Sequence, residues 1–134
     1  MSLTKAFADY PHTRRVGDWI YLAGQGCRDP QTDSYAGTSI VDDRVETYDI
    51  RLQTAGCLDN MIRALATEGA VLEHLVDVTV FLRDKSDFAA MNEVWNETIS
   101  AVKAPPTRTT IFVRDLPGHN FVEMKGVAHA PFQS

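Results

Sequence analysis

The stretch PPTRTTIFVRDLPGHNFVEMKGVA, residues 105–128, is the most informative part of the sequence. It predicts two strands joined by a turn at Pro117 and Gly118, because β-branched and aromatic residues dominate both runs and a Pro-Gly pair separates them. The first strand carries Arg108 and the second carries Glu123. Strands usually place apolar or small polar side chains at such positions, so these two residues stand out.

Arg108 and Glu123 are the candidate catalytic pair. Alternation along a strand puts Arg108 on one face with Thr110 and Phe112, and Glu123 on one face with Lys125. A guanidinium can hold a carboxylate through two parallel hydrogen bonds, and a carboxylate can take a proton from water. The pair therefore suggests hydrolysis of a small acid. The alternative is a salt bridge between two strands on a solvated sheet face.

The length and composition of the chain are those of one globular domain. Its 134 residues, 44% hydrophobic and 23% charged, contain no stretch typical of a linker, so residues 1–134 are expected to form a single unit. No apolar run approaches the length of a membrane helix, and the N-terminus lacks the pattern of a secretory signal. We therefore expect a cytoplasmic protein without membrane contact.

The net charge and the spacing of the cysteines and histidines indicate which partners and metal sites to expect. The net charge of −5 argues against nucleic acid, which requires clustered Lys and Arg. Cys27 and Cys57 lack C-x-x-C spacing and are expected to be separate thiols, with Cys57 in the core. The histidines are scattered without the spacing of metal ligands, so we expect no metal site.

The rest of the chain shows the periodicities of further strands and helices. Residues 13–16 and 19–25 predict a hairpin, and residues 75–83 alternate like a half-buried strand. Residues 49–68 have the apolar stripe of an amphipathic helix. A second helix is expected from an N-cap at Ser86 or Asp87 to about residue 102.

Between the hairpin and the first helix, residues 38–47 are polar and ambiguous, and we interpret them as an added surface loop. The predicted order is then β-β-α-β-α-β-β, an α+β fold in which a mixed sheet carries two helices on one face. The other sheet face lacks a cover. We expect it to pack against copies of the same chain.

The segments PTRTT, LPG and VEMKGVA together resemble the closing signature of the Rid family, the reactive intermediate (enamine or imine) deaminases. The resemblance extends from about residue 10 to residue 128. It implies a chorismate-mutase-like fold and a homotrimer, or a multiple of one. In such a trimer three sheets form a central barrel, and substrate pockets lie in the clefts between subunits.

The resemblance also implies roles for individual residues. Arg108 matches the carboxylate-binding arginine and Glu123 the water-activating glutamate. Tyr10 and Asn92 match a pocket tyrosine and a pocket asparagine, while Thr110 stands where many members have a cysteine. Alternatively, Tyr10 anchors the N-terminus and Asn92 hydrogen-bonds within its own helix.

The segment AGQG, residues 23–26, is similar to the S-G-Q segment that lines the pocket in the family. Ala23 and Gly24 are therefore expected at the substrate, with Ala23 in place of the serine. Glycines at a strand end also let a ligand or another backbone come close, although a plain exit from the strand would look the same. Lys125 replaces an acidic residue of the family, which makes its surroundings more positive.

Residues 10–18, YPHTRRVGD, are most similar to the 2-aminomuconate deaminases. This closer resemblance implies that 2-aminomuconate is hydrolysed to 4-oxalocrotonate and ammonia. No cofactor is expected, because an imine is already electrophilic. A dicarboxylate requires a second cation besides Arg108, since a buried unpaired carboxylate is costly. The candidates are Arg15, then Lys125, then Arg28.

Three other functions remain open at this stage. The protein could be a general 2-imino acid deaminase or a non-catalytic sensor of small acids. A chorismate-mutase-like activity could also use a dicarboxylate between subunits. That isomerisation needs no water-activating carboxylate, so Glu123 argues against it.

Overall fold

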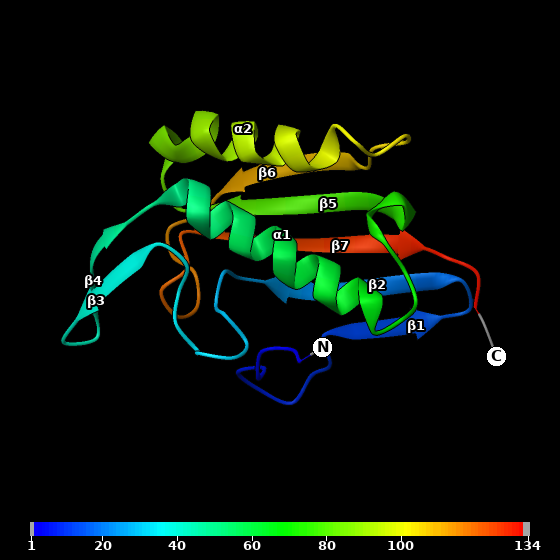
Figure 1. Ribbon diagram of the computed structural model, residues 1–134, viewed down its shortest axis with the longest axis horizontal. Coiled ribbons are helices and arrows are strands. Elements are labelled where there is room, and N and C mark those ends of the chain that lie inside the picture. The colour runs from blue at the N-terminus through cyan, green and yellow to red at the C-terminus, as the bar shows by residue number, and fades with distance from the viewer. Residues whose placement is uncertain (1, 133–134) are drawn as a thin grey trace.

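Five strands form a mixed sheet, and two helices cover one of its faces (Figure 1). The computed structural model describes residues 2–132; residues 1, 133 and 134 of the expected domain lie outside that range. The sheet strands are β1 (Thr13–Val16), β2 (Trp19–Gln25), β5 (Leu75–Leu82), β6 (Thr107–Phe112) and β7 (Val122–His129). Their order is β1-β2-β7-β5-β6, with β5 and β6 parallel and the other pairs antiparallel. The predicted α+β fold is confirmed.

The hairpin of β1 and β2 forms as expected around Gly17, whose φ of 59° suits a residue without a side chain. Ile20 and Leu22 of β2 are buried under the helices, while Trp19 and Tyr21 point to the other sheet face. This alternation fixes which face each β2 residue occupies.

Helix α1 (Ile50–Ala66) begins at Asp49, whose carboxylate accepts hydrogen bonds from the backbone N–H groups of Arg51 and Leu52. The expected apolar stripe packs on the sheet, and Cys57 is fully buried in the core as predicted. Ile62 is an exception, because it lies at the solvent side of the helix. Cys27 and Cys57 are both free thiols.

Helix α2 (Phe88–Ile99) is shorter than expected. A 3₁₀ turn (Lys85–Asp87) precedes it, and the side chain that caps this turn is Asp84, which accepts from the backbone N–H of Ser86. Asp87 does occupy the predicted N-cap position of α2, but its side chain makes no capping hydrogen bond. The Asp87 carboxylate instead accepts a hydrogen bond from the Tyr48 hydroxyl at 2.7 Å.

The alternation predicted for β5 fails at its first residues. Leu75 is buried and Val76 is exposed, because the pairing of β5 with β7 shifts register between Leu75 and Asp77. From Val78 onward the expected residues face the helices. Beyond the register shift, the side chains of β5 therefore occupy the predicted faces in the region of the candidate site.

Strands β6 and β7 are both present, but they are not neighbours, because β5 lies between them. Arg108 is in register with Val78 of β5, and Glu123 is in register with Phe81. Val78 and Phe81 are three residues apart on one strand, so their partners lie on opposite faces of the sheet. A salt bridge between Arg108 and Glu123 within one chain is therefore excluded.

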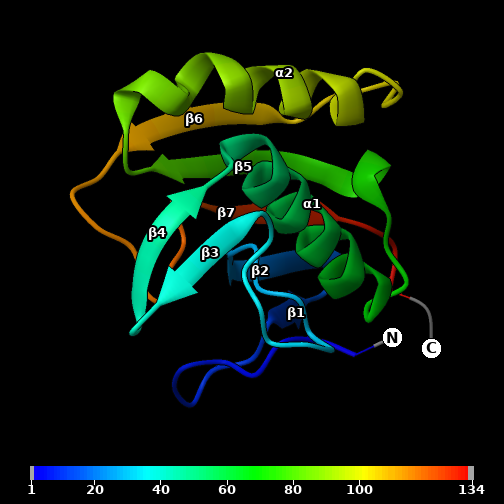
Figure 2. The same cartoon turned by 60° about the vertical axis from the view of Figure 1, so that its left-hand side comes forward.

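Residues 38–47 do not form the loop expected from the sequence. They belong to a second, two-stranded sheet made of β3 (Thr38–Val41) and β4 (Arg44–Tyr48), which projects beside α1 (Figure 2). Asp42 and Asp43 form its tight turn with φ values of 52° and 59°. Aspartate tolerates this left-handed conformation better than most residues, which allows the turn.

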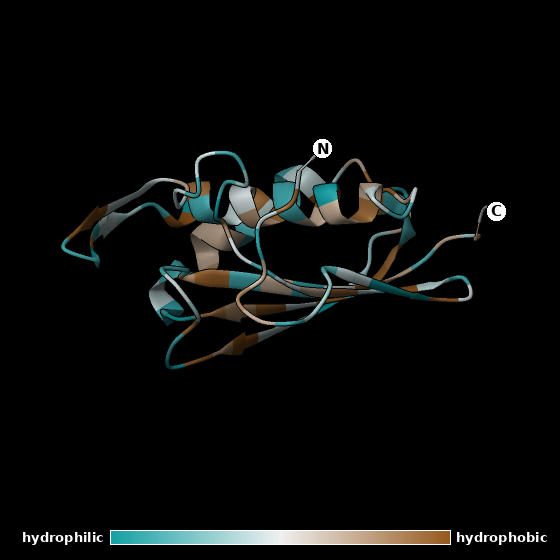
Figure 3. Ribbon diagram, turned by 90° about the horizontal axis from the view of Figure 1, so that it is seen from below, coloured by the Kyte–Doolittle hydropathy of each residue, from teal (hydrophilic) through white to brown (hydrophobic). Residues whose placement is uncertain are grey.

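The sheet face away from the helices exposes several large apolar side chains. Figure 3 shows hydrophobic stretches along the strands as well as on the helices that cover the sheet. The exposed side chains on this face include Val16, Trp19, Tyr21 and Ile111. These exposed apolar side chains agree with the expectation that this sheet face packs against copies of the chain. That packing stays a prediction.

Candidate functional site

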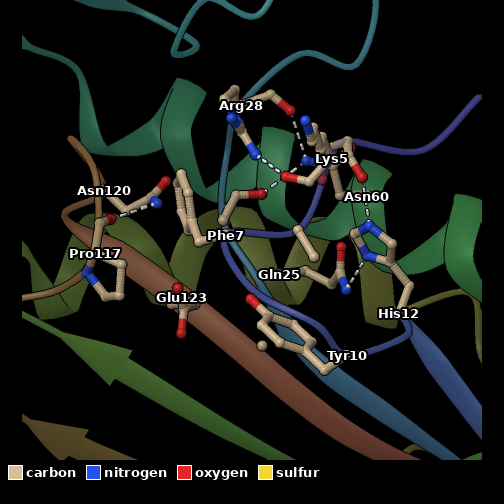
Figure 4. Close-up of a pocket in the computed structure, with 14 residues that line it drawn as sticks. Lys5, Phe7, Tyr10, His12, Gln25, Arg28, Asn60, Pro117, Asn120 and Glu123 are labelled. Carbon is tan, nitrogen blue, oxygen red and sulfur yellow. Dashed lines mark hydrogen bonds between the residues drawn. The ribbon is translucent and has the colours of Figure 1, made fainter.

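Glu123 lines an open cavity of about 150 Å³ next to the end of β2 (Figure 4). One wall of the cavity is the N-terminal segment, residues 4–12, which has no regular secondary structure before the start of β1. Tyr10 of this segment and Gly24 of β2 also line the cavity. Three of the predicted site residues, Glu123, Tyr10 and Gly24, thus come together from distant parts of the sequence.

Gly24 makes room for the Glu123 carboxylate. The pairing of β2 with β7 shifts register between Leu22 and Gln25, so Gly24 lies in an irregular part of the strand beside Glu123. A Cβ atom built on Gly24 would be 2.6 Å from Oε2 of Glu123. The expected close approach at this glycine is therefore to the Glu123 side chain.

We predict that Gly24→Ala misplaces the Glu123 carboxylate. The atom displaced is the end of a flexible side chain, so the fold should survive with little change in melting temperature. Misplacing a catalytic group by about 1 Å can cost about 10²-fold in rate, so turnover should fall by that order. Steady-state kinetics and thermal denaturation of the same sample check both parts, and unchanged turnover would contradict the assignment.

Glu123 has the electrostatic setting of a general base. Burial raises the pKa of its carboxyl group above the ordinary value. It forms no salt bridge with residues 2–132, so no cation holds it in the ionised form. A carboxylate with a raised pKa is a stronger base for a water proton than an ordinary surface glutamate.

The N-terminal wall of the cavity is fixed by side chains of the hairpin and the following loop. His12 bonds the Thr4 carbonyl oxygen through Nε2 and the Gln25 side-chain amide through Nδ1, at 3.0 Å in the second case. Figure 4 shows both contacts. Tyr10, from the same segment, also lines the cavity (Figure 4). It thus lines the site, whether or not it also anchors the N-terminus.

Arg108 lies on the other face of the sheet, against α2. Its Nη2 donates to Oδ1 of Asn92 at 2.7 Å, and its guanidinium lies 5.1 Å from the ring centre of Trp95 and 5.9 Å from that of Phe88. Burial lowers the pKa of Arg108. Asn92 therefore orients Arg108. This corrects the alternative that the Asn92 side chain bonds within its own helix.

The surroundings of Arg108 favour an anion. It forms no salt bridge with residues 2–132, and a partly buried cation without a counter-charge is costly. Thr110, two residues along β6, points to the same sheet face. Its hydroxyl is buried and has no hydrogen-bond partner among the described residues. The Arg108 guanidinium offers donors for a carboxylate, whereas the Thr110 hydroxyl beside it is buried.

Ala23 and Lys125, two further residues expected at the pocket, also lie outside the cavity. Ala23 does not line it; its backbone carbonyl oxygen accepts a hydrogen bond from the Gln25 side chain, which braces the wall. Lys125 does not line it either, and lies exposed on the same sheet face as Glu123.

The order of the candidate second cations is also corrected. Arg15 does not line the cavity, because it faces the end of α1. There it forms a salt bridge with Glu68 at 3.2 Å and donates to the carbonyl oxygens of Glu68 and Ala130. Arg28, the last of the three candidates, does line the cavity.

The cavity residues that sequence reasoning missed include two with basic side chains, Lys5 and His12. Both lie in a segment without helical or strand periodicity, so no pattern assigns them a face. Arg28, in the loop after AGQG, was a partial signal for these residues, because its side chain bonds the backbone of the N-terminal segment.

Within residues 2–132, no group of three or more His, Cys, Asp or Glu side chains is arranged to hold a metal ion. No helix in the same range is long and apolar enough to cross a membrane.

Comparison with known proteins identifies the family. The model of the family described as endoribonuclease L-PSP matches residues 2–130, and a RutC family protein of Pyrococcus abyssi is 34% identical over 93% of this chain and 89% of its own. The chain therefore belongs to this family, which comprises the Rid and RutC proteins. The resemblance to the Rid family is confirmed.

Two further relatives bear on chemistry. A protein of Dermatophagoides farinae named 2-iminobutanoate/2-iminopropanoate deaminase is 28% identical, covering 88% of this chain and 83% of its own. The crystal structure of Escherichia coli TdcF with bound serine superposes with a TM-score of 0.82 at 25% identity, covering 96% of this chain and 93% of that one. The closer resemblance to 2-aminomuconate deaminases stays a prediction.

Proposed function

We propose that this protein hydrolyses a small imine or enamine that carries a carboxylate and releases ammonia. The observation that carries the proposal is Glu123, a partly buried carboxylate with a raised pKa and no cationic partner in residues 2–132, at the wall of a cavity. Further support comes from a relative named as an imine deaminase and from Arg108, which is suited to hold a carboxylate.

The reaction requires only water and proton transfers. Glu123 takes a proton from water as the oxygen bonds to the imine carbon, and passes this proton to the nitrogen. It then takes the hydroxyl proton of the tetrahedral intermediate and passes it to the amine, so that ammonia leaves, a carbonyl group remains and Glu123 is again ionised. Arg108 holds the carboxylate next to the reacting carbon, which removes much of the entropic cost of bringing the reactants together.

A site of this kind would be shared between two copies of the chain. Arg108 and Glu123 lie on opposite faces of one sheet, so one chain cannot present both to one small substrate. We propose that Arg108 of one copy and Glu123 of another meet in a cleft, as the Rid resemblance implies. Glu123 and the exposed apolar side chains share one sheet face, which supports a cleft beside a surface suited to contact between copies.

The corresponding prediction is a homotrimer or a multiple of one. Sedimentation equilibrium at micromolar concentration should give about 45 kDa, three times the 14.9 kDa of one chain, or a multiple of that mass. Replacing Tyr21 on the exposed face by a charged residue should weaken the assembly. A stable 14.9 kDa species of the wild type would overturn both the trimer and the shared site.

For the substrate, we propose 2-aminomuconate, which would give 4-oxalocrotonate and ammonia. The support is the similarity of residues 10–18 to the 2-aminomuconate deaminases and the cations at the cavity. The competing candidate is a general 2-imino acid deaminase, which the named relative favours. The ribonuclease in the family description is disfavoured for this chain by its net charge of −5.

The test generates each imine within the assay mixture and measures the ammonia that is released. An amino acid oxidase supplies 2-iminobutanoate, and a ring-cleavage dioxygenase followed by an NAD-dependent semialdehyde dehydrogenase supplies 2-aminomuconate. Ammonia release faster than the spontaneous rate from either compound supports the deaminase. No acceleration with either, together with binding of the corresponding keto acids, would favour the non-catalytic sensor.

A further inference from the structure

One side of the Glu123 cavity carries two cationic side chains, Lys5 and Arg28 (Figure 4). Among the described residues, Glu123 is the one acidic side chain that lines the cavity. We infer that Lys5 binds a second anionic group of the substrate, and that Arg28 positions Lys5 for this. The inference rests on the proposed deaminase and defines its substrate class as dicarboxylic imines.

Lys5 is available for a ligand. Its ammonium group forms neither a salt bridge nor a hydrogen bond with the other described residues, and the lysine lies at the cavity wall. A lysine ammonium is a compact point charge with three donors, so it can pair with a carboxylate that arrives from several directions. This tolerance suits the distal carboxylate of a flexible chain.

Arg28 has a different role, because its own groups are engaged. Its Nη2 donates to the backbone carbonyl oxygen of Lys5, its Nη1 pairs with Asp33 at 3.2 Å, and its plane lies over the Phe7 ring at 4.6 Å from the ring centre. Two of these contacts, to the Lys5 carbonyl oxygen and to the Phe7 ring, tie Arg28 to the N-terminal segment at Lys5 and just after it. Arg28 is thus a positioning residue that also adds positive potential to the cavity.

A second attachment point makes this wall of the cavity preformed. His12 bonds the carbonyl oxygen of Thr4, the residue next to Lys5, and is itself bonded by Gln25 of β2. The backbone of Lys5 is therefore fixed from two directions before any ligand binds. A preformed site avoids the cost of ordering a loop on binding, which increases the affinity for the correct ligand.

The two ends of the site then divide the substrate between them. Arg108 of one copy holds the carboxylate next to the reacting carbon, and Glu123 of the other copy activates water. Lys5, on the same chain as Glu123, receives the far carboxylate. A monocarboxylic imine satisfies Arg108 but leaves Lys5 without a partner, so discrimination between the two classes should depend on Lys5.

The first experiment measures kcat/KM of Lys5→Met for a dicarboxylic and a monocarboxylic imine. Losing a hydrogen bond to a charged group should lower kcat/KM for 2-aminomuconate about 10- to 100-fold, with 2-iminobutanoate changed less than about 2-fold. Lys103→Met, an exposed position after α2, is the matched control and should change neither. Arg28→Gln should behave like Lys5→Met, and Arg28→Lys should not restore the wild-type ratio.

The second experiment measures binding without turnover. Muconate and sorbate share a six-carbon diene chain and differ in the second carboxylate. Calorimetry should show wild type preferring muconate, and Lys5→Met losing that preference. Equal changes for both ligands, or none, would overturn the inference. If wild type deaminates neither imine, the proposed function fails, while the muconate and sorbate titrations still decide whether Lys5 reads a second carboxylate.

Discussion

Glu123→Gln is expected to lower kcat about 10²- to 10⁴-fold while the protein still binds a substrate-like dicarboxylate, because general acid–base catalysis is typically worth that much and the amide keeps the shape of the side chain. Stopped assays of ammonia release give kcat, and calorimetry with muconate gives the affinity. Glu46→Gln, on the exposed strand β4, is the matched control and should keep full activity.

The same substitution should stabilise the protein at neutral pH. Burial raises the pKa of Glu123, so the folded state binds its proton more tightly than the unfolded state does. The stability of the wild type therefore falls as pH rises from the ordinary glutamate pKa through the raised one. Glutamine removes this loss, so Glu123→Gln should melt at a higher temperature than wild type at pH 7, with the difference vanishing in acid.

A gain in stability together with a loss of rate separates a catalytic from a structural role. If Glu123 instead formed a stabilising salt bridge with a residue of another copy, Glu123→Gln would melt at a lower temperature and lose binding and rate together. The pH dependence gives a further check, since wild-type kcat should fall in acid as Glu123 takes up its proton at its raised pKa.

The sequence predicts which side chains of β6 and β7 share a sheet face, but it does not predict which strands lie next to each other in the sheet. Alternation along β6 and β7 correctly grouped Arg108 with Thr110, and Glu123 with Lys125. The insertion of β5 between the two strands depends on a crossover through α2 and on long-range pairing, which local sequence does not encode. This pairing is what separates Arg108 and Glu123 onto opposite faces.

Two other errors have identifiable physical causes. The hairpin of β3 and β4 was missed because its turn uses Asp42 and Asp43 at positive φ in place of the usual Asn-Gly or Asp-Gly pair. Lys5 was missed because contacts from Arg28, distant in sequence, place it at the cavity. Side chains in segments without periodicity take their positions from tertiary contacts, so a sequence pattern cannot locate them.

Arg108→Ala should lower kcat/KM about 10²- to 10⁴-fold for every carboxylate-bearing imine, since it removes two hydrogen bonds between charged groups, each worth about 1.5–3 kcal/mol. Arg108→Lys should recover little of this loss, because an ammonium cannot present two parallel donors. The fold should persist, since Arg108 pairs with no carboxylate in residues 2–132. Arg44→Lys on β4 is the control.

Asn92 offers an independent way to perturb the same arginine. Asn92→Asp would place a carboxylate where Oδ1 accepts from Arg108 at 2.7 Å. The new charge would compete with the substrate carboxylate for the guanidinium, so KM should rise with a smaller change in kcat. Full activity of Arg108→Lys, or an unchanged KM of Asn92→Asp, would contradict carboxylate binding by Arg108.

Mixing the two inactive variants tests whether the site is shared. In a cleft built from two copies, an Arg108→Ala chain still supplies Glu123, and a Glu123→Gln chain still supplies Arg108. Random assembly of trimers from equal amounts of the two chains would then restore both residues in about one quarter of the clefts. Co-expressed variants should therefore recover about one quarter of wild-type activity, whereas a site built within one chain would recover none. The opposite faces of Arg108 and Glu123 in one sheet favour the first result.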